Sequence, residues 1–152
     1  MSIKEICNRN IVFARRGESI ADAAKLMREH HVGSVVVVED RGGRRLPVGM
    51  LTDRDIAIGV VALGLDPAKT PVEGAMRAEL VSARENDSIN RAVSLMRAQG
   101  VRRVPVVDAG GALVGLLAAD DLMELFAGEM AGLAAVIGRG EQRERALRPA
   151  AV

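Results

Sequence analysis

Two short stretches of the chain carry side chains that could bind a ligand. In the first, GMLTDRDI (49–56), Thr52 and Asp55 follow an apolar run where a strand passes into a helix. The spacing T-x-x-D matches a capping box, in which each side chain bonds the other residue's backbone N–H. A carboxylate can also accept two hydrogen bonds from a vicinal diol, and a helix N-terminus attracts anions. Capping and ligand binding therefore both stay open.

The second stretch is the pair Arg102-Arg103, which precedes the apolar run VPVV. Taken alone, these are solvated residues that pair with surface carboxylates, but a guanidinium fork also suits a phosphate. We expect no metal site, because the only histidines, His30 and His31, are adjacent and so point in different directions on a helix. No Cys–His or Ser–His pairing suggests nucleophilic catalysis, and we expect no enzyme.

The elements that position these side chains occur twice. The segment 18–40, ESIADAAKLMREHHVGSVVVVED, aligns with 87–109, DSINRAVSLMRAQGVRRVPVVDA, at an offset of 69 residues. Further along, GMLTDRDI aligns with GLLAADDL (115–122) at an offset of 66, because the first glycine turn is longer. The same alignment sets Cys7 on Met76, which predicts a buried packing role for the cysteine. An internal repeat is therefore the main organising feature.

Each repeat predicts the same order of elements. Ser19 and Ser88 are good N-caps before segments with apolar residues at helical spacing. Short β-branched runs, glycine-pair hairpin turns, return strands and closing helices follow. We expect two βαββα repeats, 1–66 and 67–128, packed face to face with pseudo-twofold symmetry in one compact α/β (α+β) fold. Residues 129–152 are expected to extend the last helix until Gly138 and Gly140 end it, leaving a charged mobile tail.

Composition excludes several classes of partner. The 152 residues include 21 Lys plus Arg and 20 Asp plus Glu, a net charge of +1 that gives no basic surface for duplex nucleic acid. Two phenylalanines are the only aromatic residues, so no stacking platform for single strands exists. No apolar run approaches the roughly 18 residues that span a bilayer, and the start does not read as a signal peptide. We expect a cytoplasmic protein without a membrane partner.

The duplicated pattern resembles a pair of cystathionine β-synthase (CBS) domains. It consists of an apolar strand, a glycine turn and a G-h-h-T-x-x-D segment (h, apolar) within tandem βαββα units, over about residues 3–127. The resemblance implies a regulatory module that binds adenine nucleotides such as AMP, ADP, ATP or S-adenosylmethionine between its repeats. It implies no required cofactor, because the nucleotide acts as a regulatory ligand.

Transferred residue by residue, the resemblance implies two unequal clefts. In the main cleft Asp55 would take the ribose hydroxyls, Thr52 the ribose or phosphate, and Arg102 and Arg103 the phosphate. The strand residues Leu80 and Val81 would line the base. The weaker cleft would be formed by Val12, Ser34 and Asp121. There Ala118 replaces the threonine, and Gly33-Ser34 replaces the arginine pair.

Two functions fit this sequence. The first is an adenine-nucleotide sensor that acts as a homodimer and signals to an effector protein of unknown identity. The alternative is a ligand-free structural module for dimerisation or scaffolding. The closing helix of the second repeat carries a longer apolar stripe than that of the first, which favours a second copy of the chain as partner.

Overall fold

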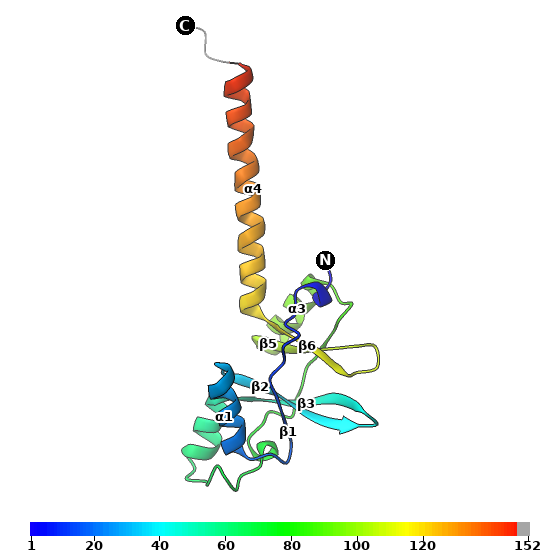
Figure 1. The fold of residues 1–152 in the computed structure, drawn as a ribbon, viewed down its shortest axis with the longest axis vertical. Coiled ribbons are helices and arrows are strands. Elements are labelled where there is room, and N and C mark those ends of the chain that lie inside the picture. Colours follow the sequence, from blue (N-terminus) through cyan, green and yellow to red (C-terminus); the bar gives the residue numbers. More distant parts are fainter. Residues whose placement is uncertain (149–152) are drawn as a thin grey trace. The chain divides into compact units, whose positions relative to one another are not determined.

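The computed structural model describes residues 1–148, in which two units are distinguished, one of residues 1–117 and one that begins at residue 118. Most of both repeats lies in the first unit. The first repeat contains the 3-10 helix η1 (Ile3–Glu5), β1 (Phe13–Arg15), α1 (Ile20–His30), β2 (Ser34–Arg41), β3 (Arg44–Thr52), α2 (Asp53–Ile56) and a π-helical turn η2 (Ala57–Val61). The second contains η3 (Val72–Gly74), β4 (Ala83–Arg84), α3 (Ile89–Gln99), β5 (Arg103–Val107), β6 (Leu113–Ala118) and α4 (Ala119–Leu147) (Figure 1).

Each repeat forms a three-stranded sheet, with the orders β1-β2-β3 and β4-β5-β6. The leading strand pairs in parallel with the central strand, and β2 pairs antiparallel with β3. The turn between β2 and β3 uses Gly42 and Gly43 at φ of 57° and 76°, a conformation that glycine adopts without strain. The expected α/β architecture with two βαββα repeats is confirmed.

The helix starts follow the predicted caps. The hydroxyl of Ser19 accepts a hydrogen bond from the Asp22 N–H at 3.1 Å, and Ser88 does the same for Arg91 at 3.3 Å. Each helix buries its apolar face, including Ile20, Ala23 and Met27 in α1. These residues join a core of fully buried strand residues, including Val35, Val37 and Leu51. Local capping and apolar spacing therefore suffice to form this layer.

The leading segments are exchanged between the repeats. η1 is hydrogen-bonded to the second repeat, because the Ile3 N–H donates to the Asp87 carbonyl at 3.0 Å. η3 is hydrogen-bonded to the first repeat, because the Val72 N–H donates to the Glu18 carbonyl at 2.8 Å. The Val72 side chain also belongs to the core of the first repeat. Because residues 3 and 72 are equivalent under the offset of 69, this exchange is a pseudo-twofold feature. The two repeats therefore share one folded unit.

A second reciprocal contact closes the seam between the repeats. Met50 in β3 exchanges two backbone hydrogen bonds with Arg77, at 3.1 and 2.9 Å, and Leu116 in β6 exchanges two with Asn8, both at 2.9 Å. The close approach of the two backbones at Met50 and Arg77 requires a glycine at the neighbouring position 49. A Cβ atom on Gly49 would lie 2.8 Å from the Arg77 carbonyl oxygen.

The thiol of Cys7 lies at the equivalent place in the other seam. A Cβ atom on Gly115 would lie 2.6 Å from its Sγ atom. Burial raises the pKa of the Cys7 thiol. Cys7 is half-buried, so it packs against the seam as its alignment with Met76 predicts, but it is not fully buried.

The two glycine turns meet in the first unit. Arg44 Nη2 lies 3.1 Å from Asp108 Oδ1. That oxygen also accepts hydrogen bonds from the N–H groups of Ala112 at 2.9 Å and Gly110 at 2.8 Å. The Ala112 and Gly110 N–H groups and the Arg44 guanidinium together lower the pKa of the Asp108 carboxyl. Asp108 therefore organises its own turn and joins it to the turn of the first repeat.

In the second unit, the prediction that the last helix ends at Gly138 and Gly140 is wrong. Gly138 and Gly140 do not end the last helix, because α4 continues without interruption to Leu147 (Figure 1). A glycine costs a helix about 1 kcal/mol without breaking it, and strong helix formers follow here. Glu141 and Arg145 also stand four residues apart, a favourable helical pair. The expected irregular tail is thus helical over residues 141–147, and residues 149–152 lie outside the described part of the chain.

Candidate functional site: a capped strand–helix junction

The junction of β3 and α2 forms the predicted capping box. Thr52 has an extended backbone, and its Oγ1 accepts a hydrogen bond from the Asp55 N–H at 3.1 Å. In return Asp55 Oδ2 accepts one from the Thr52 N–H at 2.9 Å. The Asp55 side chain is only 12% exposed. The cap therefore fixes a largely buried carboxylate and uses one of its two oxygens.

The other oxygen of Asp55 pairs with a residue that the sequence did not single out. Arg77 Nε lies 3.3 Å from Asp55 Oδ1, and the arginine side chain is 64% exposed. The backbone exchange between Met50 and Arg77 carries this side chain from the second repeat to the first. Its counterpart in the repeat is Asn8, so only the charge difference between equivalent positions could have drawn attention to it.

The other predicted residues of the main cleft lie in the second repeat. Arg103 is the half-buried first residue of β5, and Arg102 precedes it and is exposed. Leu80 and Val81 are half-buried in the segment before β4, and the prediction that they are strand residues is wrong. The leading strand is shorter because only Ala83 and Arg84 pair with β5. That these residues and Asp55 close on one ligand stays a prediction.

The weaker predicted cleft is assembled differently. Ser34 is 5% exposed and pairs directly opposite Thr52 in the β2–β3 ladder, so residues assigned to the two clefts adjoin here. Val12 is half-buried, and its carbonyl accepts a hydrogen bond from Val36 at 3.2 Å. Asp121 belongs to the second unit, where its Oδ2 accepts a hydrogen bond from the Ala118 N–H at 3.2 Å.

The second junction is therefore only half of a capping box. Asp121 accepts from the N-cap backbone as Asp55 does. Ala118 has no side-chain oxygen to accept a hydrogen bond from the Asp121 N–H, as Thr52 Oγ1 does from the Asp55 N–H. The two junctions therefore differ in their cap hydrogen bonds, and the inequality of the two clefts stays a prediction.

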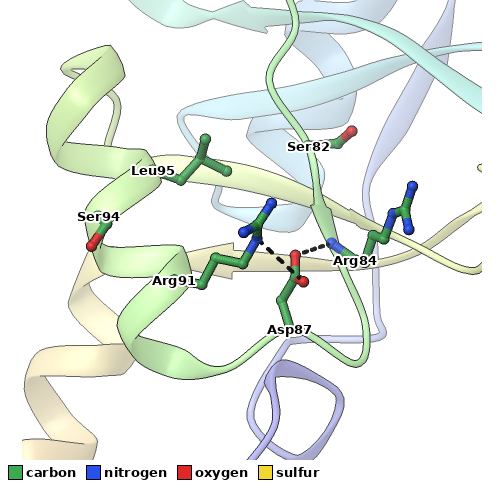
Figure 2. Close-up of a pocket in the computed structure, with 6 residues that line it drawn as sticks. All are labelled: Ser82, Arg84, Asp87, Arg91, Ser94 and Leu95. Carbon is green, nitrogen blue, oxygen red and sulfur yellow. Dashed lines mark hydrogen bonds and ion pairs between the residues drawn. The ribbon is translucent and has the colours of Figure 1, made fainter.

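An open groove of about 570 Å³ lies elsewhere in the second repeat, and no sequence pattern predicted it. Figure 2 shows its six lining residues, Ser82, Arg84, Asp87, Arg91, Ser94 and Leu95. Asp87 accepts a hydrogen bond from the Arg84 N–H at 3.0 Å and pairs with Arg91 Nε at 3.4 Å. In the first repeat Phe13 replaces Ser82, and the Arg45 guanidinium covers its ring at 3.8 Å. Loss of this aromatic side chain in the second repeat is consistent with the groove.

Other side chains give little support for further chemistry. Over residues 1–148, no group of three or more His, Cys, Asp or Glu side chains is placed to hold a metal ion. His31 ends α1 in the left-handed conformation, with φ of 53°, and has a structural role as its C-cap. In the same described range, no helix is long and apolar enough to cross a membrane.

Removing the threonine hydroxyl tests the cap separately from any ligand. We expect Thr52→Ala to lower the free energy of unfolding by about 1 kcal/mol, because the Asp55 N–H loses its acceptor. Thr52→Ser retains the hydroxyl and should remain within about 0.5 kcal/mol of the wild type. Urea denaturation without nucleotide measures both values, and equal stabilities for the two variants would contradict the capping role.

Comparison with known proteins agrees with this architecture. A family model of the CBS domain matches residues 3–61 and 72–128. The CBS domain-containing protein YhcV of Bacillus subtilis is 40% identical over 134 residues, 88% of this chain and 91% of YhcV. The uncharacterized protein MK0525 of Methanopyrus kandleri is 33% identical over 125 residues, 82% of this chain, and the match spans 62% of its length.

Solved structures show the same fold. The CBS domain pair of protein MJ0100, in complex with 5-methylthioadenosine and S-adenosyl-L-methionine, is 27% identical with a TM-score of 0.73, over 85% of this chain and 98% of that one. PAE2072 from Pyrobaculum aerophilum, complexed with AMP, is 27% identical with a TM-score of 0.72, over 80% and 90%. Hypoxic Response Protein I, with two coordinated zinc ions, is 32% identical with a TM-score of 0.72, over 82% and 98%. Since the family model matches both repeats and covers most of the chain, the protein belongs to the CBS domain family, as a pair of CBS domains.

Proposed function

We propose that the chain is a regulatory module that binds an adenine nucleotide, acts as a homodimer and signals to an effector protein. The observation that carries this proposal is the Asp55 carboxylate. It is largely buried and fixed by its cap, and its Oδ1 atom pairs with the mostly exposed side chain of Arg77. Such an acceptor suits the vicinal hydroxyls of a ribose, since Arg77 can swing into solvent. Two structural relatives, MJ0100 and PAE2072, are complexed with adenosine-containing ligands.

The proposed main cleft combines groups from both repeats. Thr52 and Asp55 are contributed by the first repeat, and Arg102 and Arg103 by the second. Leu80 and Val81 offer apolar surface and main-chain groups to the base. Arg77 becomes a further candidate, because a guanidinium released from Asp55 would remain near the bound anion. The weaker cleft, with Val12, Ser34 and Asp121, has no arginine at the matching positions and is expected to bind weakly or not at all.

A ligand held between the repeats would act through their shared seams. The exchanged segments and the Met50–Arg77 and Asn8–Leu116 contacts join the two repeats at several points. A nucleotide favours whichever arrangement of the repeats it binds better, and so shifts their equilibrium. We therefore propose regulation rather than catalysis, with the effector responding to that shift.

Calorimetry with AMP, ADP, ATP and S-adenosylmethionine tests this proposal on the full chain. We expect at least one of them to bind with one strong site per chain, and to raise the melting temperature. For AMP, ADP or ATP, Arg103→Ala should weaken binding at least about tenfold by removing a phosphate partner. Arg28→Ala, which removes an exposed arginine of α1, is the matched control and should have no effect.

Two outcomes would overturn parts of the proposal. Two equal strong sites per chain would contradict the inequality of the clefts. If none of the four ligands binds, the nucleotide role fails and the ligand-free scaffold becomes the better function.

A further inference from the structure

The exposed apolar residues of α4 follow a heptad spacing. Met123, Phe126, Met130, Leu133 and Ile137 succeed one another at steps of three, four, three and four residues. All five are exposed, from 46% for Phe126 to 70% for Met123. An average step of 3.5 residues is the spacing of a coiled-coil seam, whereas a stripe against a globular core follows 3.6 and is wider. This face, the α4 seam formed by these five residues, therefore suits packing against another long helix.

The length of α4 exceeds what a repeat needs. The equivalent helical segment of the first repeat, α2 with η2, ends at Val61, which the offset of 66 places on Ala127. Beyond that point α4 continues for another 20 residues, 128–147, which at about 1.5 Å per residue is roughly 30 Å of helix. Three of the five seam residues lie in this extension. The seam is therefore an addition to the repeat.

The charges of α4 identify the orientation of its partner. Residues 119–133 contain four acidic side chains and no basic one, at Asp120, Asp121, Glu124 and Glu129. Residues 134–148 contain four arginines and two glutamates, a net charge of +2. In a parallel pair, the acidic halves of the two helices, each with a net charge of −4, would lie side by side and repel each other. In an antiparallel pair, the acidic half of each helix lies beside the half of the other helix that has a net charge of +2. Antiparallel helix dipoles add to this preference.

We propose that two copies of the chain pair through α4 as an antiparallel coiled coil. In the register that centres the seam, Met130 packs on Leu133 of the second copy and Phe126 packs on Ile137 of the second copy. The same register brings Glu124 level with Arg139 of the second copy. The small residues Ala127 and Ala134 occupy flanking positions next to the seam and allow close approach of the helices.

This inference gives the proposed homodimer an interface, and it does not depend on the identity of the ligand. Multi-angle light scattering of the full chain at tens of micromolar should give the mass of a dimer. The double variant Met130→Glu/Leu133→Glu should raise the dissociation constant at least about 100-fold, because it buries four unpaired charges per dimer. Ala131→Glu/Ala135→Glu adds the same charge outside the seam and should remain dimeric.

Disulfide trapping tests the orientation. In a Cys7→Ser background, Met123→Cys chains mixed with Gly140→Cys chains should crosslink under mild oxidation, because the two positions face each other in the proposed register. Met123→Cys chains alone should not, since antiparallel pairing separates their two thiols by about 25 Å along the axis. Crosslinking of Met123→Cys alone would indicate parallel helices and overturn the proposal.

Three other results would also overturn it. The first is a monomeric wild type, which would mean that the stripe is covered within the chain. The second is a seam variant, Met130→Glu/Leu133→Glu, that dimerises as well as the wild type. The third is a control variant, Ala131→Glu/Ala135→Glu, that loses the dimer as fully as the seam variant does. Circular dichroism and nucleotide titration of the seam variant show whether the rest of the chain is intact. Normal nucleotide binding by a monomeric variant would separate this interface from the nucleotide proposal.

Discussion

Replacement of Gly49 by alanine is expected to lower the free energy of unfolding by about 2–3 kcal/mol. The new Cβ atom would lie 2.8 Å from both the Arg77 carbonyl oxygen and the Met76 sulfur. The methionine side chain can rotate away, but the carbonyl cannot move without weakening its hydrogen bond from the Met50 N–H, at 3.1 Å. The substitution therefore opens the seam between the repeats. Guanidinium denaturation of the full chain measures the effect.

Two controls distinguish this steric cause from a general effect of alanine. Gly17 has no atom within 4 Å of its Cβ position and no positive φ, so Gly17→Ala should be neutral or slightly stabilising. At Gly115 the nearest atom is the Cys7 sulfur, a side-chain atom, so Gly115→Ala should be partly rescued by Cys7→Ala. For Gly49→Ala the added change Met76→Ala should rescue little, because the main-chain clash remains. Full rescue there would contradict the role assigned to the Arg77 carbonyl.

The features that could be predicted from the sequence are those set by local chemistry. Ser19 and Ser88 begin helices because a hydroxyl satisfies an N–H group a few residues away, within one segment. The Thr52–Asp55 box is local in the same way. Because the same order of elements occurs in both repeats, a pattern that was ambiguous in one repeat could be assigned by comparison with the other. Fold class and capped junctions followed from these signals.

The features that could not be predicted depend on long-range packing. The exchange of η1 and η3 brings residues together that are more than 50 positions apart, and backbone hydrogen bonds carry no residue-specific signal. Arg77 reaches Asp55 only through this exchange. The continuation of α4 past Gly138 and Gly140 depended on the balance of glycine against its helix-forming neighbours. Each of these outcomes is decided by context outside the motif.

Asp55→Asn is expected to separate the cap from the ligand at this junction. The asparagine oxygen can still accept the Thr52 N–H, as Asp55 Oδ2 does at 2.9 Å, so the free energy of unfolding should fall by no more than about 1 kcal/mol. The charge and the second acceptor are lost, so affinity for the adenine nucleotide should fall about 100-fold. Urea denaturation and calorimetry on the same preparation measure the two effects.

The second junction supplies the matched control. Asp121 also accepts a hydrogen bond from its N-cap residue, Ala118, at 3.2 Å, so Asp121→Asn makes the same chemical change at the equivalent position. That junction has no hydroxyl where Thr52 stands, and Gly33-Ser34 replace its arginines. Nucleotide affinity of Asp121→Asn should therefore match the wild type. If Asp121→Asn weakens binding as much as Asp55→Asn does, both clefts bind nucleotide. If neither variant weakens it, Asp55 is a cap and the ribose is held elsewhere.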